Sequence, residues 1–85
     1  MKNKLFVGNL SMSTEEPDLR NAFSPYGELL SLTIVRDRET SQSRGFGFVE
    51  FRSGDDAARA QQALDGQWLK DHSIVVSAAR DRRDR

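Results

Sequence analysis

The residues best suited to a chemical role lie in one short stretch, residues 44–51, in which glycines and phenylalanines alternate. Alternate residues of an extended strand share a face. One face of this stretch carries Gly47, Val49 and Phe51. The opposite face carries Arg44, Phe46, Phe48 and Glu50. Val49 and Phe51 suit a buried core and the charged Glu50 does not. The pattern therefore predicts that Phe46 and Phe48 point outward beside Arg44.

A third phenylalanine, Phe6, extends this outward set. Leu5 and Val7 alternate with Phe6, so burial of the two aliphatic residues leaves Phe6 on the outer face. Contiguous exposed apolar area marks a binding surface. Flat rings beside a cation suit unstacked nucleobases, because bases stack on the rings while the cation meets phosphate. The three rings predict a site for single-stranded nucleic acid, and burial in a protein interface is the alternative.

The elements that must position these side chains are predicted from hydrophobic periodicity and from turn residues. Period-two alternation predicts four strands, at residues 4–10, 29–35, 44–51 and 73–79. Two helical segments fall between them, one after the first strand and one after the third. A polar, charged loop is predicted between the second and third strands, and a loop or short extended piece precedes the fourth.

The first helix is predicted from its apolar stripe, which consists of Leu19, Ala22 and Phe23. Thr14 is a candidate for its N-cap, and a capping box formed by Ser13 and Glu16 is the alternative. Pro17 then falls in the first turn, where a missing N–H costs little. The helix is expected to end at residues 25–27, which are Pro, Tyr and Gly.

The second helix is predicted over residues 57–64. Residues 53–56 supply its cap and two first-turn acids, which suit the positive end of the helix dipole, and Gly66 is the expected stop. Trp68 is expected to cover the edge of the core beside this helix, and a direct contact with nucleic acid is the alternative.

The order of elements is βαββαβ. It predicts an α+β, ferredoxin-like sandwich: a four-stranded antiparallel sheet with two helices on one face. Two helices cover only one face of such a sheet, so the aromatic set lies on the open face. The domain is expected to span residues 1–80, followed by a mobile Arg/Asp tail at residues 81–85.

Two segments match signatures of a known family. Residues 5–10, Leu-Phe-Val-Gly-Asn-Leu, resemble the hexamer signature of the RNA recognition motif. Residues 44–51 match its octamer, basic–Gly–aromatic–Gly–aromatic–Val–any–aromatic, at every constrained position. The resemblance covers Lys4 to about Arg80. The chain looks like the small single-domain members of the family known from bacteria and plastids, without the glycine-rich tail that some of them carry.

The resemblance implies an RNA-binding set: Lys4, Phe6, Asn9, Arg44, Phe46, Phe48, Ser77, Ala79 and Arg80. Phe6 and Phe48 are each expected to stack under a base, and Phe46 to pack against sugars. Arg44 is expected to pair with phosphate, and the three residues that end the set to contact base edges. The sequence departs from the family at Gln61, where an aliphatic residue is usual, and at residues 71–72, where Asp-His replaces Gly-Arg.

The charge pattern bounds the strength of binding. The chain has 13 Lys and Arg against 13 Asp and Glu, so its net charge is zero. Acidic residues collect in the helical segments, and basic residues on strands, the loop at 36–43 and the tail. Such segregation makes a basic face, but a weak one. Two or three stacked bases at roughly 1–3 kcal/mol each then predict an affinity on the order of micromolar.

Several classes of protein are disfavoured. The chain has no cysteine, which excludes disulfides and thiolate metal sites, and its one histidine has no partner at useful spacing. No nucleophile–base pair is apparent, so neither an enzyme nor a cofactor is predicted. No apolar run approaches the roughly 18 residues of a spanning helix. We expect a cytoplasmic monomer without membrane association that binds single-stranded RNA, with single-stranded DNA or a protein partner on the helical face as alternatives.

Overall fold

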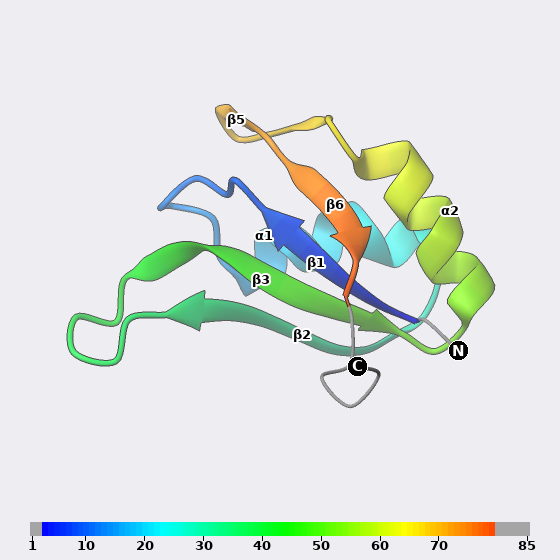
Figure 1. Cartoon of the computed structure of the whole chain (residues 1–85), viewed down its shortest axis with the longest axis horizontal. Helices are drawn as coiled ribbons and strands as arrows, with labels where there is room; N and C mark the ends of the chain where they lie inside the picture. The colour runs from blue at the N-terminus through cyan, green and yellow to red at the C-terminus, as the bar shows by residue number, and fades with distance from the viewer. Residues whose placement is uncertain (1–2, 80–85) are drawn as a thin grey trace.

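Four strands pair into one antiparallel sheet in the order β2-β3-β1-β6 (Figure 1). The computed structural model describes residues 3–79. Its elements are β1 (Lys4–Gly8), α1 (Glu16–Phe23), η1 (Ser24–Tyr26), β2 (Leu29–Arg36), β3 (Ser43–Phe51), α2 (Gly54–Leu64), β4 (Trp68–Leu69), β5 (His72–Ser73) and β6 (Val75–Ala78). This arrangement confirms the predicted ferredoxin-like βαββαβ fold. The predicted mobile tail, residues 81–85, lies outside the described residues.

The two helices lie on the same side of the sheet. α1 packs on β2, while α2 packs across β1, β3 and β6. In the view of Figure 1, α1 passes behind the sheet and the strands face the reader. Among the described residues, no helix crosses the near face, so the side chains on that face are available to a ligand.

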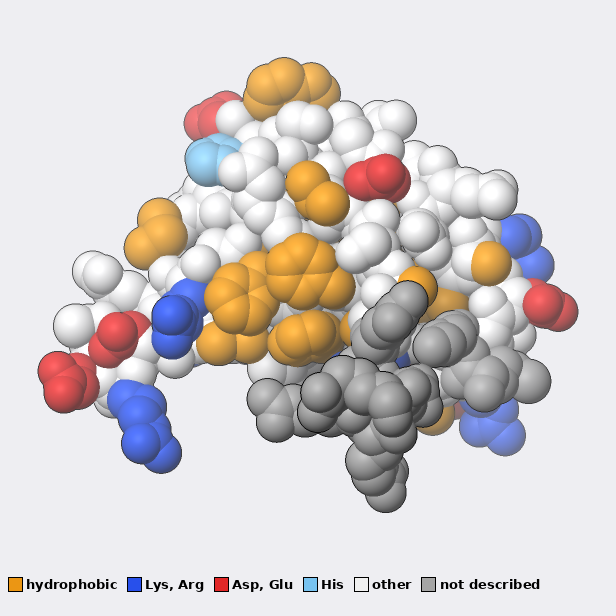
Figure 2. Space-filling model, in the orientation of Figure 1, with side chains coloured by type: hydrophobic (Ala, Val, Ile, Leu, Met, Phe, Trp, Pro, Cys, Tyr) orange, Lys and Arg blue, Asp and Glu red, His pale blue; other side chains and the backbone are white. Residues whose placement is uncertain are grey.

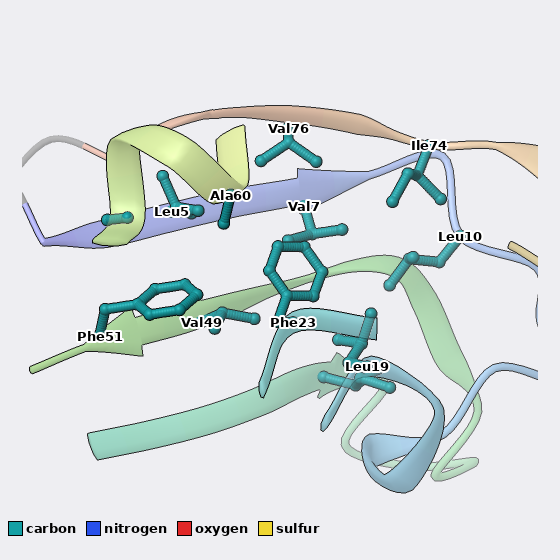
Figure 3. Packing of buried hydrophobic residues seen from close by; sticks show 12 residues of the cluster. Leu5, Val7, Leu10, Leu19, Phe23, Val49, Phe51, Ala60, Ile74 and Val76 are labelled. Carbon is teal, nitrogen blue, oxygen red and sulfur yellow. The ribbon is translucent and has the colours of Figure 1, made fainter. Parts of the chain in front are cut away.

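The hydrophobic core fills the space between the sheet and the helices (Figure 3). Its buried members are Leu5, Val7, Leu10, Leu19, Phe23, Ile34, Val49, Phe51, Ala57, Ala60, Ile74 and Val76. At its centre the rings of Phe23 and Phe51 have centroids 6.4 Å apart. The inward-facing sets predicted for β1 and β3 are therefore confirmed, and the alternate residues of both strands point to the open face.

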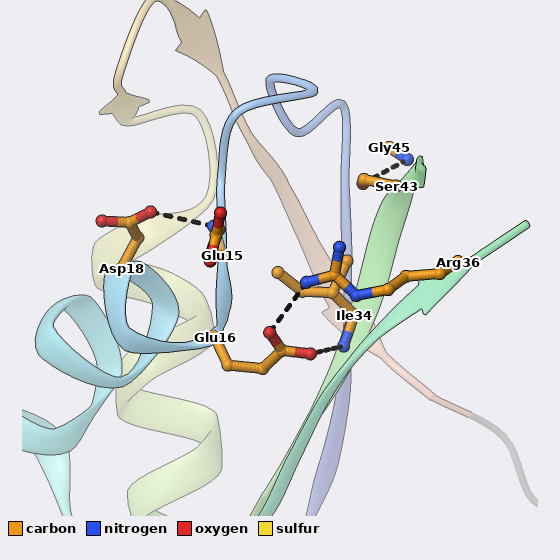
Figure 4. Close-up of polar contacts among 7 residues, drawn as sticks. All are labelled: Glu15, Glu16, Asp18, Ile34, Arg36, Ser43 and Gly45. Atoms are coloured by element: carbon orange, nitrogen blue, oxygen red, sulfur yellow. Dashed lines mark hydrogen bonds and ion pairs between the residues drawn. The ribbon is translucent and has the colours of Figure 1, made fainter. Parts of the chain in front are cut away.

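The start of α1 differs from both predictions, because Pro17 fixes it. With Thr14 as N-cap, Pro17 would stand at N3 and could not donate to the cap, since proline has no N–H. The helix instead starts at Glu16 with Glu15 as N-cap, and the Glu15 N–H donates to Asp18 Oδ2 at 2.8 Å (Figure 4). Thr14 is buried, and its hydroxyl has no hydrogen-bond partner within the described part of the chain.

The start of α2 agrees with its predicted cap. Ser53 Oγ accepts hydrogen bonds from the N–H groups of Asp55 and Asp56, at 3.1 and 3.4 Å. The helix begins at Gly54, three residues before the predicted Ala57. It places the small Ala57 and Ala60 against the sheet, whereas Gln61 is half-buried and lies outside the core cluster.

The expected position of Trp68 was wrong. Trp68 and Leu69 form β4, which pairs with β5 as a separate two-stranded sheet. Neighbouring residues of a strand point to opposite sides, and Leu69 is the one that packs on the core. Trp68 is consequently 73% exposed. The predicted single strand 73–79 is divided at Ile74, whose N–H donates to Gln67 O at 2.9 Å, away from β1.

Candidate nucleic-acid interface

Three phenylalanine rings adjoin on the open face of the sheet. Phe6 on β1 is the cross-strand neighbour of Phe48 on β3, and Phe46 lies two residues before Phe48 on the same face. The ring centroids are 5.7 Å apart for Phe6–Phe46, 5.9 Å for Phe6–Phe48 and 6.3 Å for Phe46–Phe48. We call these three residues the aromatic platform. Figure 2 shows hydrophobic side chains gathered at the centre of this face, over β1 and β3.

Mutual packing holds the platform in place. Each of the three residues is half-buried although none of the described helices covers them, because the rings cover one another. Tilted and edge-to-face aromatic pairs at these separations attract each other by roughly 0.5–1.5 kcal/mol beyond area burial. A ligand that stacks on the platform therefore meets rings whose orientation is already fixed, which lowers the entropy lost on binding.

The Phe6 ring lies over the backbone of Gly8. A Cβ atom on Gly8 would stand 2.7 Å from Phe6 Cε2 and 3.0 Å from Phe6 Cζ, closer than carbon atoms approach without displacement. Gly8 thus allows the Phe6 ring to lean along β1 toward the end of the strand. The hexamer requirement for glycine at this position has a steric origin in this chain.

The start of β3 is shaped by Gly45, which has a left-handed φ of +86°. The Gly45 N–H donates to Ser43 Oγ at 3.0 Å (Figure 4), and the Leu10 N–H donates to Gly45 O at 2.8 Å. These bonds join the beginning of β3 to the loop after β1. They place the exposed Arg44 on the open face, next to Phe46.

The β2–β3 loop is organised by Asp37. Its Oδ1 accepts hydrogen bonds from the N–H groups of Glu39 and Thr40, at 2.8 and 3.1 Å. These backbone bonds, together with a smaller contribution from the Arg44 charge, lower the pKa of Asp37. The carboxylate close to Arg44 weakens the positive potential at this end of the platform, in keeping with the zero net charge of the chain.

Lys4 lies beside the other end of the platform. Its Nζ stands over the Phe48 ring, 5.1 Å from the centroid, within the range of a cation–π contact. Lys4 is exposed and its long side chain can rotate, so a base that stacks on Phe48 can displace the ammonium toward a phosphate. The structure thus brings Lys4, Arg44 and the three rings onto one surface, as the sequence predicts.

The remaining predicted residues are placed less clearly for binding. Asn9 Nδ2 donates to Ser73 O at 2.7 Å, a bond that ties the end of β1 to β5. Ala79 donates its N–H to Lys4 O at 2.8 Å, so that donor is taken up by pairing with β1. Ser77 is half-buried and is the cross-strand neighbour of Phe6. Arg80 lies outside the described residues. RNA contacts by these four residues stay predictions.

Three polar residues on the open face, Ser31, Thr33 and Glu50, have no binding role in the predictions from sequence. Thr33 is the cross-strand neighbour of Phe48, and Ser31 and Lys4 are those of Glu50. Ser31 and Thr33 alternate along β2 with Leu32 and with the buried Ile34, so they lie on the outer side of the strand. The pairing of β2 with β3 brings Ser31 and Thr33 beside the platform, and the sequence pattern does not reveal this pairing.

Metal sites and membrane-spanning helices are absent from the described residues. No group of three or more His, Cys, Asp or Glu side chains there could hold a metal ion. None of the described helices is long and apolar enough to cross a membrane. The aromatic platform is therefore the candidate binding site in the described part of the chain.

A four-stranded antiparallel sheet with stacking aromatics on its uncovered face defines a class of nucleic-acid-binding domain. The chain belongs to the RNA recognition motif family, whose sequence profile matches residues 5–75. It is 48% identical to glycine-rich RNA-binding protein 3, mitochondrial, of Arabidopsis thaliana over 80 residues, which are 94% of this chain and 26% of the relative. The first curated relatives that it matches are longer than this chain, which spans between 26% and 60% of their length.

Solved structures agree with this assignment. The crystal structure of RNA binding protein PG1 is 39% identical, with a TM-score of 0.89 over 93% of this chain and 95% of that one. An Sxl-lethal protein/RNA complex is 31% identical, with a TM-score of 0.91 over 95% of this chain and 48% of that one. One of the solved structures that share this fold is therefore a complex of protein with RNA.

Proposed function

We propose that this chain binds short single-stranded RNA by stacking bases on the aromatic platform, without catalysis. The observation that carries the proposal is the set of three adjoining rings on a face that no described helix covers. The names of its relatives, glycine-rich RNA-binding proteins, and the solved protein/RNA complex support the same function. A base on Phe48, a second on Phe6 and a sugar against Phe46 form the minimal contact.

The expected affinity is modest. Stacking contributes roughly 1–3 kcal/mol per base, and ordering a flexible strand opposes it. Lys4 and Arg44 are the described cations that flank the platform, so few phosphates are neutralised. We expect dissociation constants on the order of micromolar and a salt slope of about −0.7 for each neutralised phosphate.

An NMR titration tests the proposal. Labelled protein is titrated with a pool of random short single-stranded RNA, and backbone amide shifts are followed. Shifts concentrated in residues 4–9, 44–50 and 75–79 are expected, and they are expected to disappear in a Phe46→Ala/Phe48→Ala variant. Arg20→Gln changes an exposed side chain of α1, on the helical side of the sheet, and serves as the control. Absence of shifts in a folded wild-type protein at high micromolar RNA contradicts the proposal.

The alternatives predict other results. Equal affinity for DNA and RNA of the same sequence would place single-stranded DNA among the natural ligands, since only a 2′-hydroxyl contact separates the two. A protein partner on the helical face is a second alternative, and a shallow hollow lined by Tyr26, Arg59, Gln62 and Ala63 lies on that face. We favour nucleic acid over a protein partner because the platform rings suit bases, and RNA over DNA because the relatives are named as RNA-binding proteins. If the chain is a monomer, light scattering is expected to give the same molecular mass at every protein concentration. The cytoplasmic location of the protein stays a prediction.

A further inference from the structure

We infer that Glu50 selects the base bound beside Phe48 and favours guanine over uracil there. The inference rests on the proposed RNA binding and adds base selectivity to it. Glu50 is the acidic side chain of the outward set of β3, in line with Arg44, Phe46 and Phe48. A carboxylate on a surface that meets RNA has to face base edges, because phosphate repels it.

The sheet register places Glu50 in a polar row next to the aromatic one. Its cross-strand neighbours are Lys4 on β1 and Ser31 on β2. The adjoining row contains Phe6 and Phe48, with Thr33 on β2. Residues i and i+2 of a strand are about 7 Å apart on the same face, close to the width of a base. A base stacked on Phe48 therefore brings an edge to Glu50.

Ser31 holds the carboxylate in place. Its Oγ donates to Glu50 Oε1 at 3.1 Å. That bond engages one oxygen of the carboxylate and restricts the rotation of a half-buried side chain. A fixed acceptor discriminates better than a mobile one, since less conformational entropy is lost when it bonds to a ligand.

The chemistry of the four bases sets the order of preference. An ionised carboxylate only accepts hydrogen bonds. The Watson–Crick edge of guanine offers two adjacent donors, N1–H and the N2 amino group, to a carboxylate. Adenine and cytosine each offer one amino group. Uracil offers a single N3–H between two carbonyl oxygens, which the carboxylate repels.

Charge along β3 supports this orientation of the RNA. Arg44 and Glu50 stand at opposite ends of one row of side chains, with the platform between them. Phosphate is attracted to the Arg44 end and repelled from the Glu50 end. The row thus offers one donor and one fixed acceptor.

The test measures binding of short RNA pools, each with one position fixed as G, A, C or U and the others random. Fluorescence anisotropy is recorded for wild type, Glu50→Gln and the control Glu28→Gln, which removes an exposed carboxylate paired loosely with Arg52. We expect wild type to favour G over U by about fivefold or more at one position, the value of a good bidentate contact. Glu50→Gln is expected to reduce that ratio below about twofold, because its amide both donates and accepts. Glu28→Gln is expected to leave it unchanged.

Ser31→Ala provides a second variant that keeps the charge and frees the carboxylate. A G-to-U ratio for Ser31→Ala that lies between those of wild type and Glu50→Gln supports the inference. If Glu50→Gln does not fold, a ratio for Ser31→Ala below that of wild type is the supporting result. The inference is overturned if wild type binds RNA with no G preference at any position, or if the preference survives in Glu50→Gln and Ser31→Ala. A wild-type protein that binds no RNA, or whose binding persists in Phe46→Ala/Phe48→Ala, overturns the proposed platform function instead.

Discussion

At the residue scale, the binding surface depends on the missing side chain of Gly8. Any Cβ at this position meets the Phe6 ring at 2.7 Å. The ring and not the backbone has to move, because Gly8 is paired with Val75 in the sheet. The shape of the platform is therefore controlled from a residue that does not belong to it.

Gly8→Ala is expected to weaken RNA binding while the fold persists. Displacement of Phe6 removes one stacking surface, which is worth roughly 1–3 kcal/mol, so affinity is expected to fall by about fivefold or more. Fluorescence titration of Gly8→Ala, Phe6→Ala and the double variant measures the coupling. If the two changes act through the same ring, the double variant binds no more weakly than Phe6→Ala. Additive losses contradict this account.

A second residue-scale prediction concerns Lys4. If its ammonium moves to a phosphate on binding, Lys4→Met is expected to make the slope of log K against log salt shallower by about 0.7. Arg20→Gln, which removes a cation from the exposed side of α1, is expected to leave the slope unchanged. The measurement is a salt titration of RNA affinity by anisotropy. An unchanged slope in Lys4→Met would mean that this lysine meets no phosphate.

At the element scale, the start of α1 is tied to the free edge of β2. β2 is an edge strand, and the Ile34 N–H that points away from β3 donates to Glu16 Oε2 at 3.4 Å (Figure 4). Arg36 Nη2 binds Glu16 Oε1 at 2.9 Å. Partial burial tends to raise the pKa of Glu16, but hydrogen bonds from its own backbone, Arg36 and Ile34, with the Arg36 charge, lower it. Unpaired strand edges favour pairing with other chains. The charged Glu16 side chain covers part of the free edge of β2.

The pKa of Glu16 gives a stability prediction with a defined sign. Because the folded state lowers this pKa, the contribution is complete above the ordinary glutamate range and is lost as the pH falls through the lower, folded value. Both side chains of the pair are more than a third exposed, so we expect less than about 1 kcal/mol. Urea unfolding at pH 6 and pH 3 measures it in wild type and Glu16→Gln. The variant is expected to lose less stability on acidification, and an equal loss contradicts the assignment.

Much of this arrangement could be predicted because it depends on local periodicity. Alternation in β1 and β3 was enough to separate Val49 and Phe51 from the platform. The start of α1 was missed because Pro17 was taken as acceptable anywhere in the first turn, whereas a cap at Thr14 would place it at N3, where an N–H is needed. The exposure of Trp68 was missed because β4 and β5 are too short to show a period. The Asn9–Ser73 bond joins residues 64 positions apart, which no local pattern reveals.

At the scale of the whole molecule, charge is arranged by face in spite of a net charge of zero. First-turn acids lie at the start of both helices, on the side away from the platform. Lys4 and Arg44 lie on the open face together with the carboxylate of Glu50 on β3, which runs between β1 and β2. From the described residues, we expect RNA to be attracted to the open face, and weakly.

This arrangement predicts a shallow salt dependence for the described domain. With two cations facing the ligand, the slope of log K against log salt is expected near −1.4, twice the value of about −0.7 per phosphate. Stacking supplies the remaining affinity and is insensitive to salt. Measurements between low and physiological salt, with wild type and Phe46→Ala/Phe48→Ala, separate the two contributions. A slope several times steeper would mean that electrostatic contacts outside the platform carry the binding.

The position of Lys4 over Phe48 has a consequence for which molecules can use this surface. In the free protein the ring already has an occupant, and a cation–π contact at an exposed site is worth roughly 0.5–1 kcal/mol. A nucleotide chain compensates for its removal, since a phosphate receives the displaced ammonium. Free nucleosides and uncharged aromatic metabolites offer no such exchange. We therefore expect the lysine to favour bases on a charged backbone over free nucleosides, by the roughly two- to fivefold that such a contact is worth.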